Sequence, residues 1–133
     1  MSDDKYLDEV VQYWIEKAED SLKAAKDELA AGRLSFSVNR IYYGCFYIVS
    51  AFLLRRKFRF SKHSGVRGTF HQQLVKPGLV SRENGQLYDE LFEARQRGDY
   101  VELVTFEKEN VKDWLERALR FIKEMTVLIK SEP

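Results

Sequence analysis

The spacing of apolar residues predicts a chain made of helices. Six apolar residues in the first part of the chain recur at steps of three and four: Val10, Trp14, Ala18, Leu22, Ala25 and Leu29. This period is that of one face of an α-helix, so a long amphipathic helix is expected from about Tyr6 to Ala31. Gly32 stands just beyond it and suits the left-handed conformation that ends a helix.

A second helix is expected to run to about Arg56 from Ser35 or Ser37, either of which can cap its first turn. Its apolar residues lie on nearly every side, which indicates a helix at the centre of the fold. They are Ile41, Tyr42, Cys45, Phe46, Val49, Phe52 and Leu53. The apolar run from Ile41 to Leu54 has 14 residues, whereas a membrane-spanning helix needs about 20, so we expect a buried core helix.

Three more helices are expected downstream. A short one covers about Val66 to Val75, before Pro77-Gly78. A longer one starts at a Ser81 cap and ends near Arg97, with Gly98 left-handed. Thr105 caps the last, whose inward residues are Val111, Trp114, Leu115, Ala118, Phe121, Ile122, Met125 and Ile129. Residues 1–133 are therefore expected to form one all-α domain, an up-and-down bundle of four main helices plus one short helix.

Charge is distributed unevenly along the chain. The 54 residues from Leu29 to Arg82 hold ten Lys or Arg and no Asp or Glu, whereas the other 79 residues hold 21 acids and 12 bases. The centre therefore carries +10 and the two ends carry −9, although the net charge is only +1. Such a centre suits either an anionic partner or the acidic ends of the chain itself.

The basic centre contains the segment "RRKFRFSKHSGVRGTF", residues 55–70. Cations attract phosphate and aromatic rings stack on unpaired bases, so this composition predicts contact with single-stranded nucleic acid. The expected binding residues are Arg55, Arg56, Arg59, Lys62, His63 and Arg67. The alternative is that these cations pair with the acidic outer helices of the chain, or of a second copy, while the phenylalanines are core. A steep salt dependence of binding would favour the first interpretation.

Other classes of site find little support. His63 and His71 are eight residues apart without a clear third ligand, so we expect no metal site and no cofactor. The single cysteine, Cys45, excludes an internal disulfide and fits a reducing compartment. The acidic start "MSDDKYLDEV" lacks the pattern of a signal peptide, and a cytoplasmic location is expected.

The stretch "RQRGDY", residues 95–100, has two interpretations. Arg97 and Gly98 form a good helix ending. Arg95 and Asp99, four residues apart, are also polar residues that can face a cleft.

Five segments in this order resemble the HEPN domain (higher eukaryotes and prokaryotes nucleotide-binding): "AEDSLKAA", "SFSVNRIYYGCFYIVSAFLL", "SKHSGVRGTFHQQLVKPG", "LFEARQRGDYVE" and "WLERALRFI". The resemblance covers about Trp14 to Ile122. It implies a helical bundle, commonly a homodimer, often paired with a minimal nucleotidyltransferase as a toxin–antitoxin system. Many members of the family are metal-independent endoribonucleases.

The resemblance places Arg95 at the arginine of the family's ribonuclease motif, but the histidine that follows in that motif is missing. Tyr100 stands in its place and Asp99 precedes it. Tyrosine, with a pKa of about 10, is a poor proton acceptor at neutral pH. The leading hypothesis is therefore an RNA- or nucleotide-binding and interaction module, partnered by a nucleotidyltransferase.

Two alternatives stay open. The first is an endoribonuclease in which Arg95 stabilises the reacting phosphate and Asp99, Tyr100 or His63 moves protons. The second is that a nucleotidyltransferase partner adds a nucleotide to the Tyr100 hydroxyl. If neither alternative holds, His63, which Ser64 and Gly65 follow, is expected to be a structural residue that caps a helix or bonds to the backbone.

Overall fold

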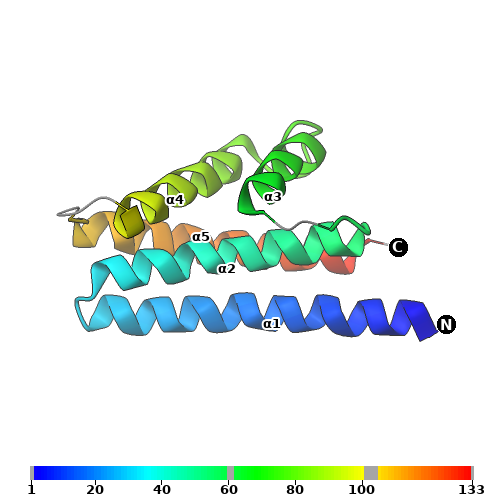
Figure 1. Ribbon diagram of the computed structural model, residues 1–133, viewed down its shortest axis with the longest axis horizontal. Helices are drawn as coiled ribbons and strands as arrows, with labels where there is room; N and C mark the ends of the chain where they lie inside the picture. The colour runs from blue at the N-terminus through cyan, green and yellow to red at the C-terminus, as the bar shows by residue number, and fades with distance from the viewer. Residues whose placement is uncertain (1, 60–61, 101–104, 133) are drawn as a thin grey trace.

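The computed structural model of the protein describes residues 2–59, 62–100 and 105–132, and within them the side chains from Lys5 to Gly98 and of 105–132. These residues form five α-helices and no strand: α1 (Ser2–Ala30), α2 (Leu34–Arg55), α3 (His63–Phe70), α4 (Arg82–Tyr100) and α5 (Lys108–Lys130). A π-helical turn, η1 (His71–Val75), continues α3. The expected all-α bundle of four main helices and one short helix is confirmed (Figure 1).

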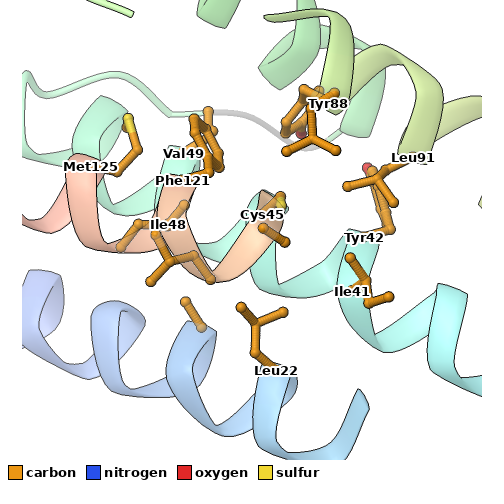
Figure 2. Packing of buried hydrophobic residues seen from close by; sticks show 14 of the residues in the cluster. Leu22, Ile41, Tyr42, Cys45, Ile48, Val49, Tyr88, Leu91, Phe121 and Met125 are labelled. Carbon is orange, nitrogen blue, oxygen red and sulfur yellow. The ribbon is translucent and has the colours of Figure 1, made fainter. Parts of the chain in front are cut away.

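Helix α2 is the central element, as its apolar pattern predicted. It contacts α1, α3, α4 and α5. Figure 1 shows α1 on one side of α2 and the α3–α4 pair on the other, with α5 beside α2. The core combines Leu22 of α1, Ile41, Cys45 and Ile48 of α2, and Phe121 of α5 (Figure 2). Among the described residues, no helix has the length and apolar character needed to cross a membrane.

The junction of α1 and α2 depends on a glycine, as expected. Gly32 has φ +80°, its N–H donates to the Leu29 carbonyl at 3.0 Å, and the Arg33 N–H donates to the Glu28 carbonyl at 2.9 Å. This pair of bonds is the Schellman motif. The predicted serine cap of α2 is wrong, since the helix begins at Leu34 and the Arg33 side chain makes no cap hydrogen bond.

Serine hydroxyls instead bind α1 to α2. The buried Ser37 hydroxyl donates to the Ala25 carbonyl at 2.8 Å, and the Ser21 hydroxyl donates to the Arg40 carbonyl at 2.7 Å. Gly44 allows the two helices to approach closely, because a Cβ atom there would lie 2.6 Å from Leu22 Cδ2. Each of these contacts involves an atom of the other helix. A capping rule that considers only neighbouring residues in the sequence cannot predict them.

The predicted helix ending at Arg97 and Gly98 is also wrong. Helix α4 continues to Tyr100, and the glycines described with positive φ are Gly32 and Gly78. A Cβ at position 98 would lie 3.2 Å from Phe106 Cε2 and 3.4 Å from the Ser35 hydroxyl oxygen. Gly98 therefore allows a close approach between chain segments inside a helix, where a turn had been expected.

Of the remaining predicted helix boundaries, one is confirmed and two differ from the structure. Ser81 caps α4 as predicted, because its hydroxyl accepts the Asn84 N–H at 3.1 Å. Thr105 does not cap α5, which follows Glu107 at the N-cap. The short helix starts at His63, three residues before the expected position, so His63 itself belongs to α3.

Candidate functional site

Helix α3 brings His63 onto the aromatic face of α2. The His63 ring stacks on Phe46 with centroids 4.2 Å apart and an interplanar angle of 21°. Its Nδ1 lies 3.0 Å from the Tyr42 hydroxyl oxygen, and the edge of the ring faces Tyr43 at 5.6 Å. His63 thus begins a helix, but its ring is held by side chains and not by the backbone contact that had been expected.

Arg95 of α4 approaches the same two tyrosines. Its guanidinium carbon lies 5.5 Å from the ring centroid of Tyr42 and 5.4 Å from that of Tyr43. Tyr42 is fully buried and Tyr43 is half-buried. The fold therefore brings His63 and Arg95, from separate helices, to one pair of rings. We call Tyr42, Tyr43, His63 and Arg95 the tyrosine cluster.

Electrostatics fix the protonation of this cluster. Burial lowers the pKa of His63, and the charge of Arg95 lowers it further. Burial raises the pKa of Tyr42 to about 12, against smaller opposing effects of Tyr88 and Arg95. At pH 7 the imidazole is therefore neutral and the phenol is protonated. The ring proton of His63 is on Nε2 if the Tyr42 hydroxyl donates to Nδ1, and on Nδ1 if that hydroxyl accepts.

Three of the six residues predicted to bind nucleic acid form ion pairs with carboxylates of the same chain. Arg55 pairs with Asp8 of α1. Arg56 forms a two-point contact with Glu132, at 3.0 and 3.2 Å. Arg67 pairs with Asp89 at 2.8 Å and with Glu93 at 3.5 Å. Two of these arginines pair with carboxylates of helices of the same chain, as the alternative interpretation expected, and Arg56 pairs with a carboxylate that follows α5.

The other members of the basic segment lie apart. Arg59 and Lys62 are exposed, and Arg59 lines a groove at the end of α2. Phe70 is buried and Phe58 packs against the core, as the same interpretation expected. Phe60 lies outside the described residues. The predicted basic surface is therefore divided between ion pairs, the tyrosine cluster and the end of α2.

Asp99 and Tyr100 occupy the last turn of α4, and their side chains lie outside the described residues. His71 does not join the tyrosine cluster, because its Nε2 bonds to Asp89 at 2.8 Å. Within residues 2–59, 62–100 and 105–132 no three His, Cys, Asp or Glu side chains gather as a metal site. Of the residues named from the family motif, Arg95 is the one whose side chain the structure places.

The order of the helices around Arg95 agrees with the resemblance noted in the sequence. A family model of the HEPN domain matches residues 11–130. The chain belongs to the HEPN family. The match includes residues of all five helices, from Val11 within α1 to Lys130 at the end of α5.

Individual HEPN relatives cover most of the chain. "UPF0332 protein" of Thermotoga maritima is 47% identical over 124 residues, 93% of this chain and 94% of the relative. "Putative toxin MJ0142" of Methanocaldococcus jannaschii is 34% identical over 108 residues, 81% of this chain and 74% of the relative. "Putative toxin MJ0605" of the same organism is 29% identical over 127 residues, 89% and 95% of the two chains.

Sequence reasoning assigned the tyrosines of this HEPN chain incompletely. Tyr42 was placed in the core by its helical spacing, which is correct, but its hydroxyl also holds His63. Tyr43 was not singled out, although its ring contacts both His63 and Arg95. The adjacent pair "YY" in the central helix was the available signal, since neighbouring helical residues point about 100° apart and so contact different neighbours.

Proposed function

We propose that this HEPN protein is an RNA- or nucleotide-binding and interaction module, and that the tyrosine cluster contacts phosphate. The observation that carries the proposal is the meeting of Arg95 and His63 on one pair of tyrosine rings. A guanidinium group offers a planar set of donors that matches two phosphate oxygens at once. The half-buried Tyr43 ring lies beside it and offers an aromatic face to a base.

One tautomer of His63, with the ring proton on Nε2, suits a binding role. While its Nδ1 accepts from Tyr42, its Nε2–H is a donor and has no lone pair with which to take a proton. A second phosphate oxygen is a suitable acceptor for that donor. Arg95 and His63 then bind an anion from two helices, without either having to change protonation.

The test measures binding of a short fluorescein-labelled single-stranded RNA by anisotropy. We expect Arg95→Ala to weaken binding about tenfold or more, because one charge-assisted contact is lost. Arg95→Lys is expected to recover part of the affinity, since lysine retains charge without the planar donors. Arg97→Ala is the matched control, an exposed arginine two positions away on the same helix. Equal losses in the two alanine variants would contradict a specific role for Arg95.

One observation also favours a second candidate, a metal-independent endoribonuclease. His63 is neutral at pH 7 and lies beside Arg95, so it fits a general base if Nδ1–H donates to Tyr42 and Nε2 carries the lone pair. Nε2 would then take the proton of the RNA 2′-hydroxyl while the 2′-oxygen bonds to phosphorus. The bond to the 5′-oxygen breaks as that oxygen takes a proton from solvent, and Arg95 stabilises the added charge.

The two candidates differ in a measurable property, the tautomer of His63. Nitrogen-15 NMR of the ring distinguishes Nε2–H, expected of the binding module, from Nδ1–H, needed by the nuclease. Cleavage assays with chelator give an independent result. A nuclease cuts RNA but not RNA with a 2′-deoxyribose at the cleaved position, and it loses activity in His63→Gln.

The partners belong to the same proposal. Two of the matched relatives carry the name of a toxin, and the family resemblance implies a homodimer paired with a minimal nucleotidyltransferase. We therefore expect sedimentation equilibrium to give twice the chain mass. Co-expression with a minimal nucleotidyltransferase from the same genome should give a complex. Intact mass after incubation with that partner and ATP tests whether Tyr100 receives a nucleotide.

A further inference from the structure

The end of α2 distant from the tyrosine cluster contains two adjoining cavities. The first, of about 620 Å³, lies between α1 and the end of α2 and is lined by Tyr6, Leu7, Val10, Leu54, Lys57 and Arg59. The second, of about 220 Å³, is lined by Trp14, Phe46, Ser50, Leu53, Leu54, Phe58, Arg59 and Val66. Leu54 and Arg59 line both, so the two cavities adjoin, and we call the pair the α2-end groove.

Lys57 holds an unfavourable backbone conformation in this groove. Its φ is +69°, which makes it the one non-glycine residue with a positive φ in the part of the chain that the structure describes. The Lys57 N–H donates to the Leu54 carbonyl at 2.8 Å and the Phe58 N–H to the Leu53 carbonyl at 2.9 Å. This is the same helix-ending motif that Gly32 forms after α1, and it favours glycine. A lysine in this position is strained, and strain of this kind concentrates at functional sites.

Ser50 supplies an independent observation in the second cavity. Its hydroxyl oxygen is buried and has no hydrogen-bond partner within the described residues. Buried hydroxyl groups are nearly always paired, so an exception needs an explanation. The surrounding Trp14, Phe46 and Phe58 rings make the cavity aromatic. The cavity thus combines aromatic walls with one cation, Arg59, and has the unpaired Ser50 hydroxyl buried in its wall, a mixture of apolar and polar groups that is usual in a ligand site.

We propose that the α2-end groove binds a phosphate-bearing ligand with a planar ring, the chemistry of a nucleotide. Lys57 and Arg59 contact the phosphate, and the ring enters the aromatic cavity, where Ser50 pairs with one of its polar edges. The described lining of both cavities contains no carboxylate to repel phosphate or neutralise the two cations. Arg55 and Arg56, in contrast, are paired with carboxylates and stay outside this site.

The phosphate contacts of this site go beyond the proposed function, because Lys57 and Arg59 lie beyond the end of α2, whereas the aromatic cavity borders the tyrosine cluster through Phe46, which stacks on His63. Lys57 is fifteen residues after Tyr42, which corresponds to about 20 Å along a helix axis. Lys57 and Arg59 can therefore be replaced without altering Arg95 or His63. A free nucleotide and the 5′-phosphorylated end of an RNA strand share the required chemistry.

The decisive variant is Lys57→Gly, measured by thermal unfolding and by isothermal titration with ADP. Removing the strain should raise the melting temperature by a few degrees, while losing the cation should weaken ADP binding about tenfold. Arg59→Gln should weaken ADP binding similarly. Lys76→Ala, an exposed lysine outside both cavities, is the charge-matched control and should bind ADP like the wild type.

Further ligands test the two halves of the site. Pyrophosphate and adenosine should each bind more weakly than ADP, and Ser50→Ala should weaken adenosine but not pyrophosphate. A 5′-phosphorylated RNA that binds more tightly than ADP identifies the RNA end as the source of the phosphate. No binding of ADP or this RNA to the wild type, or unchanged binding in Lys57→Gly, would overturn the proposal. Because the tyrosine cluster is itself proposed to bind phosphate, the titrations are repeated in Arg95→Ala, where ADP binding that remains and is lost on adding Lys57→Gly reports the groove alone.

Discussion

The tyrosine cluster and the end of α2 both present cations, but their cations have different surroundings. Arg95 faces two aromatic rings and a neutral histidine, whereas Arg55 and Arg56 face carboxylates of α1 and of the residues after α5. A carboxylate largely neutralises the cation that it pairs with, whereas an aromatic ring leaves the charge of a neighbouring cation unchanged. The acid-free run in the sequence therefore overestimates the basic surface, because its acidic partners come from distant parts of the chain.

The largest effect is expected from removing the aromatic support of the tyrosine cluster. Tyr42 is fully buried and contacts His63 and Arg95. Tyr42→Ala should cost about 3–5 kcal/mol of unfolding free energy, the range for large aromatic truncations. Tyr42→Phe keeps the ring and should cost only about 1 kcal/mol for the lost hydrogen bond. Urea unfolding measures both. Equal costs would show that the hydroxyl and not the ring dominates.

A smaller effect should follow from releasing the paired arginines. Asp8→Asn and Glu132→Gln together remove the carboxylates that face Arg55 and Arg56. Because both pairs are partly exposed, stability should fall by no more than about 1 kcal/mol per pair. Affinity for single-stranded RNA should rise several-fold at low salt, with a steeper salt dependence. Unchanged affinity would show that neutralisation is not what separates the two regions.

The smallest expected effect is the loss of folding stability at acidic pH that comes from His63. The pKa of His63 is lowered in the folded chain, whereas the unfolded chain has an ordinary value of about 6.5. Well above pH 6.5 the His63 ring is neutral in both the folded and the unfolded chain, so it does not change the free energy of unfolding. As pH falls below 6.5 the unfolded state takes up the proton first, so the stability of the wild type decreases until the lowered pKa is passed.

His63→Gln should reduce this loss of stability with acid. The comparison is urea unfolding at pH 7 and pH 5.5 for the two proteins. His71→Gln serves as a control for a histidine that bonds to a carboxylate outside the cluster. A wild type that loses no more stability than His63→Gln would contradict the assigned direction of the shift.

The sequence was sufficient for the helices because their apolar period reports which face is buried. Ser81 and Gly32 were assigned correctly, since a cap and a helix-ending glycine act within a few residues. Ser37 and Gly98 were assigned wrongly, because their roles come from Ala25 and Phe106, which lie on other segments. Local rules hold where the interaction is local.

The candidate site was predicted in part for the same reason. Arg95 and His63 were both named, but nothing in their spacing shows that α3 lies over α2 and places the two against Tyr42 and Tyr43. The strain of Lys57 was equally hidden, since a helix ending at Arg56 leaves the φ of the next residue undetermined. These relations arise from packing and are set by the whole fold.

Cys45 gives the molecule an internal reporter of its own opening. The thiol is fully buried in α2, and burial strongly raises its pKa, so the native chain offers almost no thiolate to a reagent. Labelling of Cys45 therefore requires that the helices around it separate, and its rate measures how often they do so. A ligand that binds only the closed bundle must slow this labelling in proportion to its occupancy. The labelling rate of this single cysteine thus reports both the opening of the helical bundle and the fraction of protein with ligand bound.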